Sequence, residues 1–202
     1  VAAVEKKGIR RIQGKVIIEG ARKGVRIPGS WPWEDVSNYY AALYLPFNYK
    51  DNTFTLQFRS GEAGKPVELI SVTPFLPGTE VRNEVVAAAD KRDNAWIFGG
   101  PYSPVLYVKG TIPANRAVFR VKGAMHDPAA VFVSELETVL LKNNICVEQK
   151  EITSGERYEL LSVGSPSLGE IVFHTNKSSV NLFAEALGCL AAGDDWSVRV
   201  EE

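Results

Sequence analysis

Between about residues 45 and 125, apolar residues occur in short runs separated by Gly, Pro, Asn and Asp, which is typical of β-strands joined by turns. In TFTLQF, apolar and polar residues alternate, so Phe54, Leu56 and Phe58 are expected on one face of a strand. Further strands are expected in VELISV, NAWIF, VLYVKG and AVFRVKG. Several short strands with turns between them predict a small antiparallel sandwich or barrel.

The segments before this region are less regular. Residues 1–8 are expected to be the end of a helix that stops at Gly8, and KVII (residues 15–18) predicts a buried strand. Residues 20–40 are rich in Gly and Pro and predict a loop. The two tryptophans of its SWPWEDV stretch either anchor the loop on the core or form a stacking platform for a ligand.

Helical periodicity appears after the β-rich region, in HDPAAVFVSELETVLLKNN. Asp127 is an expected N-cap, Pro128 suits the first helical position, and Asn143-Asn144 is expected to end the helix. The expected apolar stripe of this helix consists of Phe132, Leu136, Val139 and Leu140. The stretches ICVEQ and RYELLSV predict two further strands.

Two more helices are expected towards the C-terminal end. One starts in SPSLGE, where Ser167 and Glu170 have the spacing of a capping box, and the next begins after Asn181. Their expected buried residues are Leu168, Ile171 and Val172 in the first and Phe183, Ala186, Leu187 and Leu190 in the second. The polar stretch HTNKSSVN is therefore expected at the junction of two helices.

Composition excludes several classes of protein. A 202-residue chain with 45% hydrophobic and 23% charged residues is typical of an ordered protein of one domain or two small ones. A net charge of -1 without a basic stripe argues against nucleic acid as a partner, and no apolar run approaches the ~18 residues of a membrane span. Without an initiator Met or a signal peptide, the sequence is interpreted as an excised segment or a processed product.

Cys146 and Cys189 match no metal site and are expected to be buried thiols, with a disulfide as the alternative.

The stretch Ser179-Val-Asn181 raises the question of catalysis. A Ser-x-Asn by itself is expected to place Ser178 or Ser179 at the N-cap of the following helix. Together with Ser-x-x-Lys and Lys-Thr-Gly, however, it belongs to the active site of serine β-lactamases and penicillin-binding proteins. There a first serine attacks the carbonyl, a second hydroxyl passes protons and the amide holds the substrate. No serine of this chain is followed three residues later by lysine, and Lys109-Gly-Thr has the wrong order. No Gly-x-Ser-x-Gly elbow accompanies His126 or His174, so this chain contains no credible nucleophile.

Longer stretches occur in a recognisable order: GIRRIQGKVIIEG, PGSWPWEDVSNYYAA, YKDNTFTLQF, VKGTIP, DPAAVFVSELETVLLKNNICV and SVGSPSLGEIVFHTNKSSVNLFAEAL. Together they resemble the D-alanyl-D-alanine carboxypeptidase/endopeptidase family of low-molecular-mass penicillin-binding proteins. The resemblance covers nearly the whole chain and is most specific in PGSWPWED and SPSLGEIVFHTNKSSVNLFAEAL. It implies that the chain is the middle of a larger enzyme whose nucleophile precedes Val1 and whose Lys-Thr-Gly follows Glu202.

The resemblance also implies roles for single residues. Ser179 and Asn181 match the family's catalytic Ser-x-Asn in a loop between two helices, and Lys177 fits the same pattern. Val180 stands where the family commonly has Asp. Glu19 matches an acidic position, more often Asp, at the edge of the substrate cleft, where it would favour the amino group of a diamino acid. The alternative for Glu19 is an exposed acid at a strand end.

The fold that the resemblance implies is α+β. Residues 1–40 and 126–160 would form one inserted domain, residues 41–125 a β-rich domain inserted into it, and residues 161–202 part of a transpeptidase-like catalytic domain.

The expected function is that of a serine-type carboxypeptidase or endopeptidase that cleaves peptidoglycan peptides through an acyl-enzyme, without a metal or another cofactor. The expected partners are peptidoglycan peptide stems and, for the full-length enzyme only, β-lactams, in the periplasm or another extracytoplasmic location. This chain alone is expected to be inactive. The alternative is a non-catalytic β-rich scaffold or cell-wall-binding module.

Overall fold

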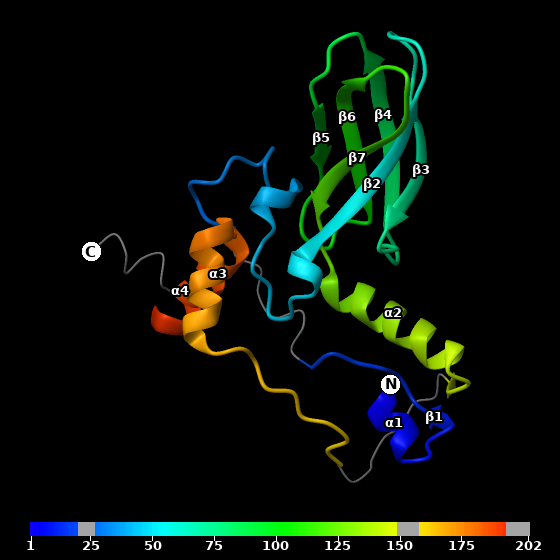
Figure 1. The fold of residues 1–202 in the computed structure, drawn as a ribbon, viewed down its shortest axis with the longest axis vertical. Coiled ribbons are helices and arrows are strands. Elements are labelled where there is room, and N and C mark those ends of the chain that lie inside the picture. Colours follow the sequence, from blue (N-terminus) through cyan, green and yellow to red (C-terminus); the bar gives the residue numbers. More distant parts are fainter. Residues whose placement is uncertain (20–26, 149–157, 193–202) are drawn as a thin grey trace.

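The computed structural model describes residues 1–19, 27–148 and 158–192, and its largest part is a pair of three-stranded β-sheets (Figure 1). One sheet has the order β3-β2-β7 and is antiparallel, with β2 at Thr53–Ser60, β3 at Glu68–Thr73 and β7 at Arg116–Ala124. The other has the order β4-β6-β5, with β4 at Glu80–Ala88, β5 at Asn94–Phe98 and β6 at Val105–Pro113. The α+β class is confirmed, and the strands form separate sheets rather than a barrel. The expectation that all of these strands are antiparallel is wrong, because β4 and β6 are parallel.

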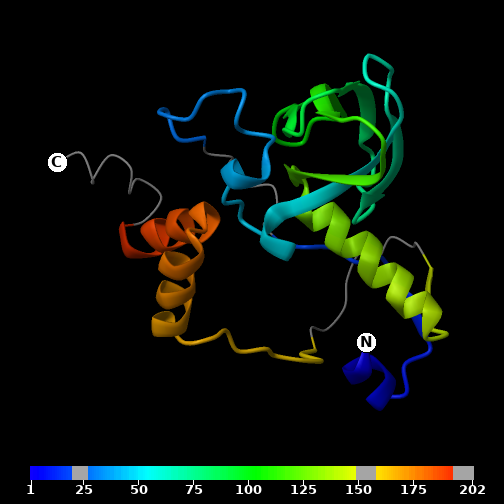
Figure 2. The same cartoon turned by 45° about the horizontal axis from the view of Figure 1, so that its top comes forward.

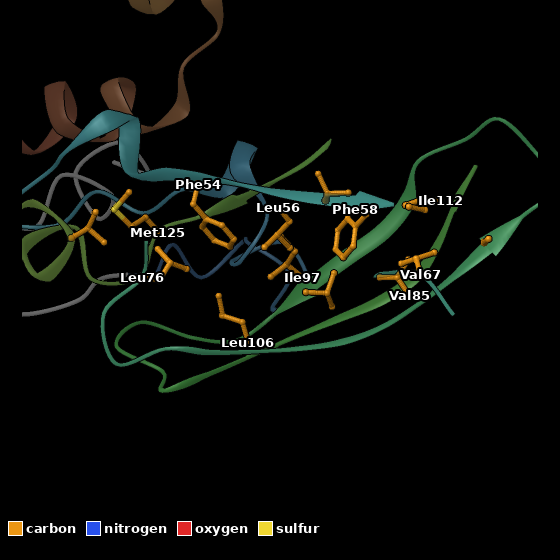
Figure 3. Close-up of a cluster of buried hydrophobic side chains, with 14 residues drawn as sticks. Phe54, Leu56, Phe58, Val67, Leu76, Val85, Ile97, Leu106, Ile112 and Met125 are labelled. Carbon is orange, nitrogen blue, oxygen red and sulfur yellow. The ribbon is translucent and has the colours of Figure 1, made fainter. Parts of the chain in front are cut away.

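The hydrophobic core lies between these two sheets (Figure 3). Phe54, Leu56 and Phe58 of β2 are each at most 1% exposed, as their alternation predicted. Close packing explains a glycine in β7: a Cβ atom at Gly123 would lie 2.5 Å from Phe54 Cζ and 2.6 Å from Ile97 Cδ1. The core therefore joins β2 and β7 of one sheet to β5 of the other.

The N-terminal segment and the region after α2 come together in a two-stranded sheet. The helix α1 (Ala2–Lys6) is followed by Gly8 at φ +70°, and β1 (Arg11–Gln13) pairs in parallel with β8 (Cys146–Glu148). The prediction of a strand at KVII is wrong, because β1 lies earlier in the chain and residues 15–18 pair with no described strand. Cys146 is exposed rather than buried, and it forms no disulfide with Cys189.

Helix α2 (Pro128–Lys142) begins as predicted, since the Asp127 Oδ1 atom accepts a hydrogen bond of 2.9 Å from the Ala130 backbone N–H. Its predicted apolar stripe is partly wrong: Val131 and Leu140 are buried, whereas Val139 is 42% exposed. The reason is that α2 projects from the end of the sandwich towards β8, and Val131 belongs to the sandwich core (Figure 1). Only residues near its two ends are therefore fully covered.

The C-terminal helices are α3 (Leu168–Ser178) and α4 (Asn181–Ala192). Both hydrogen bonds of the predicted Ser167–Glu170 capping box are present. RYELLSV is not a strand in its described part, residues 158–163, and Arg157 lies outside the described residues. The predicted buried sides are wrong in large part, because Leu168 and Leu190 are exposed and Leu182 is buried instead. The two helices contact each other, and α4 also contacts the short 3₁₀ helix η1 (Tyr39–Ala41). These contacts decide which residues are covered (Figures 1 and 2).

The loop before η1 is held by Trp31, which packs on a buried cluster of Val36, Leu43 and Leu45. This contact confirms the anchoring interpretation for one of the two tryptophans; residues 20–26 of the predicted loop lie outside the described part of the chain. No described helix combines the length and the apolar character that crossing a membrane requires.

Candidate active site

Ser179 ends helix α3 in an unusual backbone conformation. It is the C-cap residue of α3, rather than the predicted N-cap of the following helix, with φ 51° and ψ 52°. Glycine or asparagine adopts this left-handed geometry more readily than serine. The Val180 N–H donates to the Thr175 carbonyl at 3.2 Å, and α4 begins one residue later at Asn181. The junction is therefore a tight turn, and its geometry places a serine and an asparagine next to each other at the ends of two helices. Non-glycine residues in such conformations are concentrated at functional sites.

The Asn181 side chain is held by a residue far away in the chain. Its Nδ2 atom donates a 2.7 Å hydrogen bond to the backbone carbonyl of Tyr40, 141 residues earlier. The Tyr40 hydroxyl in turn donates to Asp35 Oδ1 at 2.7 Å. Burial raises the pKa of Tyr40, and the hydrogen bond with the Asp35 carboxylate raises it further, so this phenol remains a protonated donor at neutral pH.

A cavity of about 200 Å³ lies at this junction. Its walls come from η1, from the α3–α4 turn, and from the start of β2 with the preceding 3₁₀ helix η2 (Lys50–Asn52) and β7. The lining residues are Tyr39, Tyr40, Ala42, Asp51, Thr53, Lys122, Ser178, Ser179, Val180, Asn181 and Leu182. Asp51 and Lys122 are the charged residues among them. A hydroxyl and a carboxamide beside opposite charges can bind a polar substrate and pass a proton, but they do not supply an activated nucleophile.

The chain as a whole matches a known protein family. A sequence model of the D-Ala-D-Ala carboxypeptidase 3 (S13) family matches residues 1–195. The chain belongs to this family. The match covers the β-rich region, α2 and the Ser-x-Asn turn together, which confirms the resemblance noted from the sequence.

Individual known proteins are also similar to this chain. The chain is 23% identical over 168 residues to "Penicillin-sensitive carboxypeptidase A" of Dictyostelium discoideum, which covers 79% of this chain and 32% of that protein. The crystal structure of penicillin binding protein 4 from Haemophilus influenzae matches with a TM-score of 0.69 and 18% identity, covering 98% of this chain and 44% of that one. A complex of that protein with a β-lactam matches with a TM-score of 0.56 and 20% identity, covering 92% and 40%. The chain thus spans about a third to under half of the length of these proteins.

The other residues singled out from the sequence lie elsewhere. Glu19 is exposed, immediately before the undescribed residues 20–26, and is not among the described residues that line the cavity, so its role stays a prediction. Lys109 of the reversed Lys-Gly-Thr pairs with Glu84 on the sandwich surface at 3.0 Å. The His174 ring contacts Phe183 with ring centroids 5.7 Å apart, as a packing residue between α3 and α4.

Sequence reasoning missed the residues that face the Ser-x-Asn turn, namely Tyr40, Asp51 and Lys122. Tyr40 belongs to PGSWPWEDVSNYYAA, one of the stretches that carry the resemblance to the family, but nothing in its local pattern points to Asn181. Only the folded chain brings these segments together. A signal for the contact would have required information about pairs of distant residues.

Proposed function

We propose that this chain is the central part of a serine-type D-alanyl-D-alanine carboxypeptidase/endopeptidase that cleaves peptidoglycan peptides through an acyl-enzyme. The observation that carries the proposal is the cavity where Ser179 and Asn181 lie together at a turn between two helices. Membership of the S13 family and the similarity to a protein named as a penicillin-sensitive carboxypeptidase support it. The H. influenzae protein, whose fold this chain shares, has been crystallised with a β-lactam, which supports β-lactams as ligands of the complete enzyme.

In the proposed reaction, a serine outside these 202 residues attacks the carbonyl carbon of the D-Ala–D-Ala peptide bond. The C–N bond breaks, D-alanine leaves after its nitrogen takes up a proton, and water then hydrolyses the acyl-enzyme ester. Ser179 passes the hydroxyl proton of the attacking serine, through its own hydroxyl, to the nitrogen of the leaving D-alanine. Asn181 donates an Nδ2 hydrogen to the carbonyl oxygen of the substrate's peptide backbone and thereby holds the substrate in place. No metal or other cofactor takes part in these steps.

The proposed domain organisation follows the resemblance. Residues 1–40 and 126–160 form one inserted domain, residues 41–125 a β-rich domain within it, and residues 161–202 part of the catalytic domain. The pairing of β1 with β8, which joins Arg11 to Cys146, supports a single unit built from the first two segments. Because its substrate is the cell wall, the complete enzyme is proposed to act in the periplasm or another extracytoplasmic location.

A labelling experiment tests the proposed function. A complete protein that contains this chain together with Ser-x-x-Lys and Lys-Thr-Gly is expected to be labelled stoichiometrically by a fluorescent penicillin and to release D-alanine from a peptide ending in D-Ala-D-Ala. The 202-residue chain alone is expected to remain unlabelled, because none of its serines is followed three residues later by lysine. A complete protein that binds cell wall but neither takes the label nor releases D-alanine would instead be a scaffold or a cell-wall-binding module.

Glu19 is proposed to contribute to side-chain specificity at the edge of the substrate cleft, where its carboxylate attracts the amino group of a diamino acid. In the complete enzyme, Glu19→Gln is expected to lower kcat/KM by at most about fivefold, and only for peptides with a free side-chain amine, because an exposed ion pair contributes about 0–1 kcal/mol. The difference between the peptides should shrink at high salt. Glu5→Gln in α1, another exposed glutamate, is the matched control. Equal effects on both peptides would show that Glu19 does not recognise the amine.

A further inference from the structure

We propose that Tyr40 is a positioning residue for Asn181. Its backbone carbonyl orients the Asn181 carboxamide, and its phenol holds that carbonyl in place through Asp35. The inference rests on the proposed function, because it assigns a task to the groups that hold Asn181 in the reaction. It gives the loop before the β-rich region an indirect part in catalysis, through the orientation of Asn181.

The carbonyl of Tyr40 can act as a fixed reference point because its turn is attached to the sandwich. Asn38, which precedes η1 and is 5% exposed, accepts a hydrogen bond from the Ile97 N–H of β5 at 3.2 Å through its Oδ1 atom. Its Nδ2 atom donates to the Glu34 carbonyl at 2.7 Å. The Ala41 N–H donates to the Asn38 carbonyl at 3.0 Å, and Ala41 itself is buried. The backbone before Tyr40 is therefore attached to β5 through Asn38, and the backbone after Tyr40 is bonded back to Asn38.

The Tyr40 side chain adds a second attachment. Its hydroxyl donates to Asp35 Oδ1 at 2.7 Å, within the loop that leads into η1, and its ring packs edge-on against Tyr39 with centroids 5.4 Å apart. The Asp35 backbone N–H is bonded to the Pro32 carbonyl at 3.0 Å, so the acceptor also lies in a hydrogen-bonded turn. A charged acceptor makes this a stronger hydrogen bond than a neutral pair would form.

The consequence for Asn181 follows from the geometry of an amide. The Asn181 side chain is exposed and would otherwise sample several rotamers and both orientations of its amide group. The carboxamide nitrogen carries two hydrogens, and one of them is directed at the Tyr40 carbonyl at 2.7 Å. The second hydrogen and the Oδ1 atom then have fixed directions. A donor that is oriented before the substrate arrives needs no reorganisation during the reaction.

The test is a double-mutant cycle in the complete enzyme, with the rate constant for acylation by a fluorescent penicillin as the readout. Tyr40→Phe keeps the carbonyl and the ring but removes the bond to Asp35, and it is expected to slow acylation about tenfold, since small displacements of a positioned group have effects of this order or larger. Asp35→Ala should have the same effect, and Asp35→Asn, which retains an acceptor oxygen, should restore most of the rate. Tyr107→Phe is the matched control, because it removes a phenol bonded to Arg82 on the sandwich surface, outside the cavity.

The second half of the cycle separates positioning from a structural role. In an Asn181→Ala background, Tyr40→Phe should cause no further loss, because no carboxamide remains to be oriented. An equal tenfold loss in that background would overturn the inference, as would acylation within twofold of the parent rate in both Tyr40→Phe and Asp35→Ala. If Asn181→Ala itself acylates at the parent rate, the proposed role of Asn181 fails and the inference fails with it. If Tyr40→Phe does not fold, the acylation rates of Asp35→Ala and Asp35→Asn test the inference instead.

Discussion

Acylation of the complete enzyme by a fluorescent penicillin is expected to slow by about 10²–10³-fold when Asn181 is replaced by alanine. The physical reason is the loss of an oriented hydrogen-bond donor at the reacting centre. Asn181 lies on the surface of the α3–α4 turn, and its side chain bonds to the Tyr40 carbonyl rather than to the core. The free energy of unfolding should therefore change little, by about 1 kcal/mol or less.

The matched control is Asn143→Ala at the end of α2. It also removes a carboxamide whose Nδ2 atom donates to a backbone carbonyl at 2.7 Å, that of Val139, but it lies outside the cavity. Its acylation rate should equal that of the parent. An acylation rate for Asn181→Ala within about threefold of the parent would return Asn181 to a structural role as the first residue of α4.

The free energy of unfolding of the 202-residue chain is expected to fall by about 2 kcal/mol between pH 7.5 and pH 5 because of His126 alone. Both ring nitrogens of His126 are shielded from solvent, at the point where β7 leads into α2. Burial lowers the pKa of His126 to about 4, and the nearby Gly100 backbone, which favours the proton, offsets only part of this shift. The folded state therefore takes up this proton much less readily than the unfolded chain, in which the pKa of histidine is about 6.5.

The direction of the change in stability with pH follows from proton binding. Above pH ~6.5 His126 is neutral in both states, and below it the unfolded chain binds a proton that the folded chain excludes, so stability decreases as the pH falls towards about 4. Urea unfolding of the parent and of His126→Leu at several pH values measures the difference. The variant should lose the part of the pH dependence that comes from this residue. Equal pH dependence in both proteins would mean that the imidazole accepts a proton in the folded state.

Several features of the fold follow from local sequence alone. The alternation in TFTLQF placed Phe54, Leu56 and Phe58 in the core, and Asp127 and Ser167 cap α2 and α3 as their positions predicted. These features depend on period-two burial and on side chains that bond to backbone groups three residues away. Such interactions lie within one element, so the residues that determine them are neighbours in the sequence.

Other predictions failed where burial depends on what covers an element. Leu190 has the right spacing for a buried face of α4 but is 79% exposed, whereas Leu182, which lines the cavity together with residues of η1, is buried. The parallel pairing of β4 with β6 and the pairing of β1 with β8 also depend on strands far apart in the chain. The spacing of hydrophobic residues shows which side of an element can be buried, but it does not show which other element packs against that side.

The candidate site also has a part that the sequence predicts and a part that only the tertiary structure shows. The carboxypeptidase family was predicted correctly from the sequence, because its characteristic stretches are local patterns in a specific order, and the same patterns marked Ser179 and Asn181 as candidate site residues. The tertiary structure alone decided that Tyr40 bonds to Asn181 and that Asp51 and Lys122 line the same cavity. The physical reason is that these contacts require η1, η2 and β7 to lie beside the α3–α4 turn. That arrangement depends on packing between segments far apart in the chain, not on the local preference of any segment.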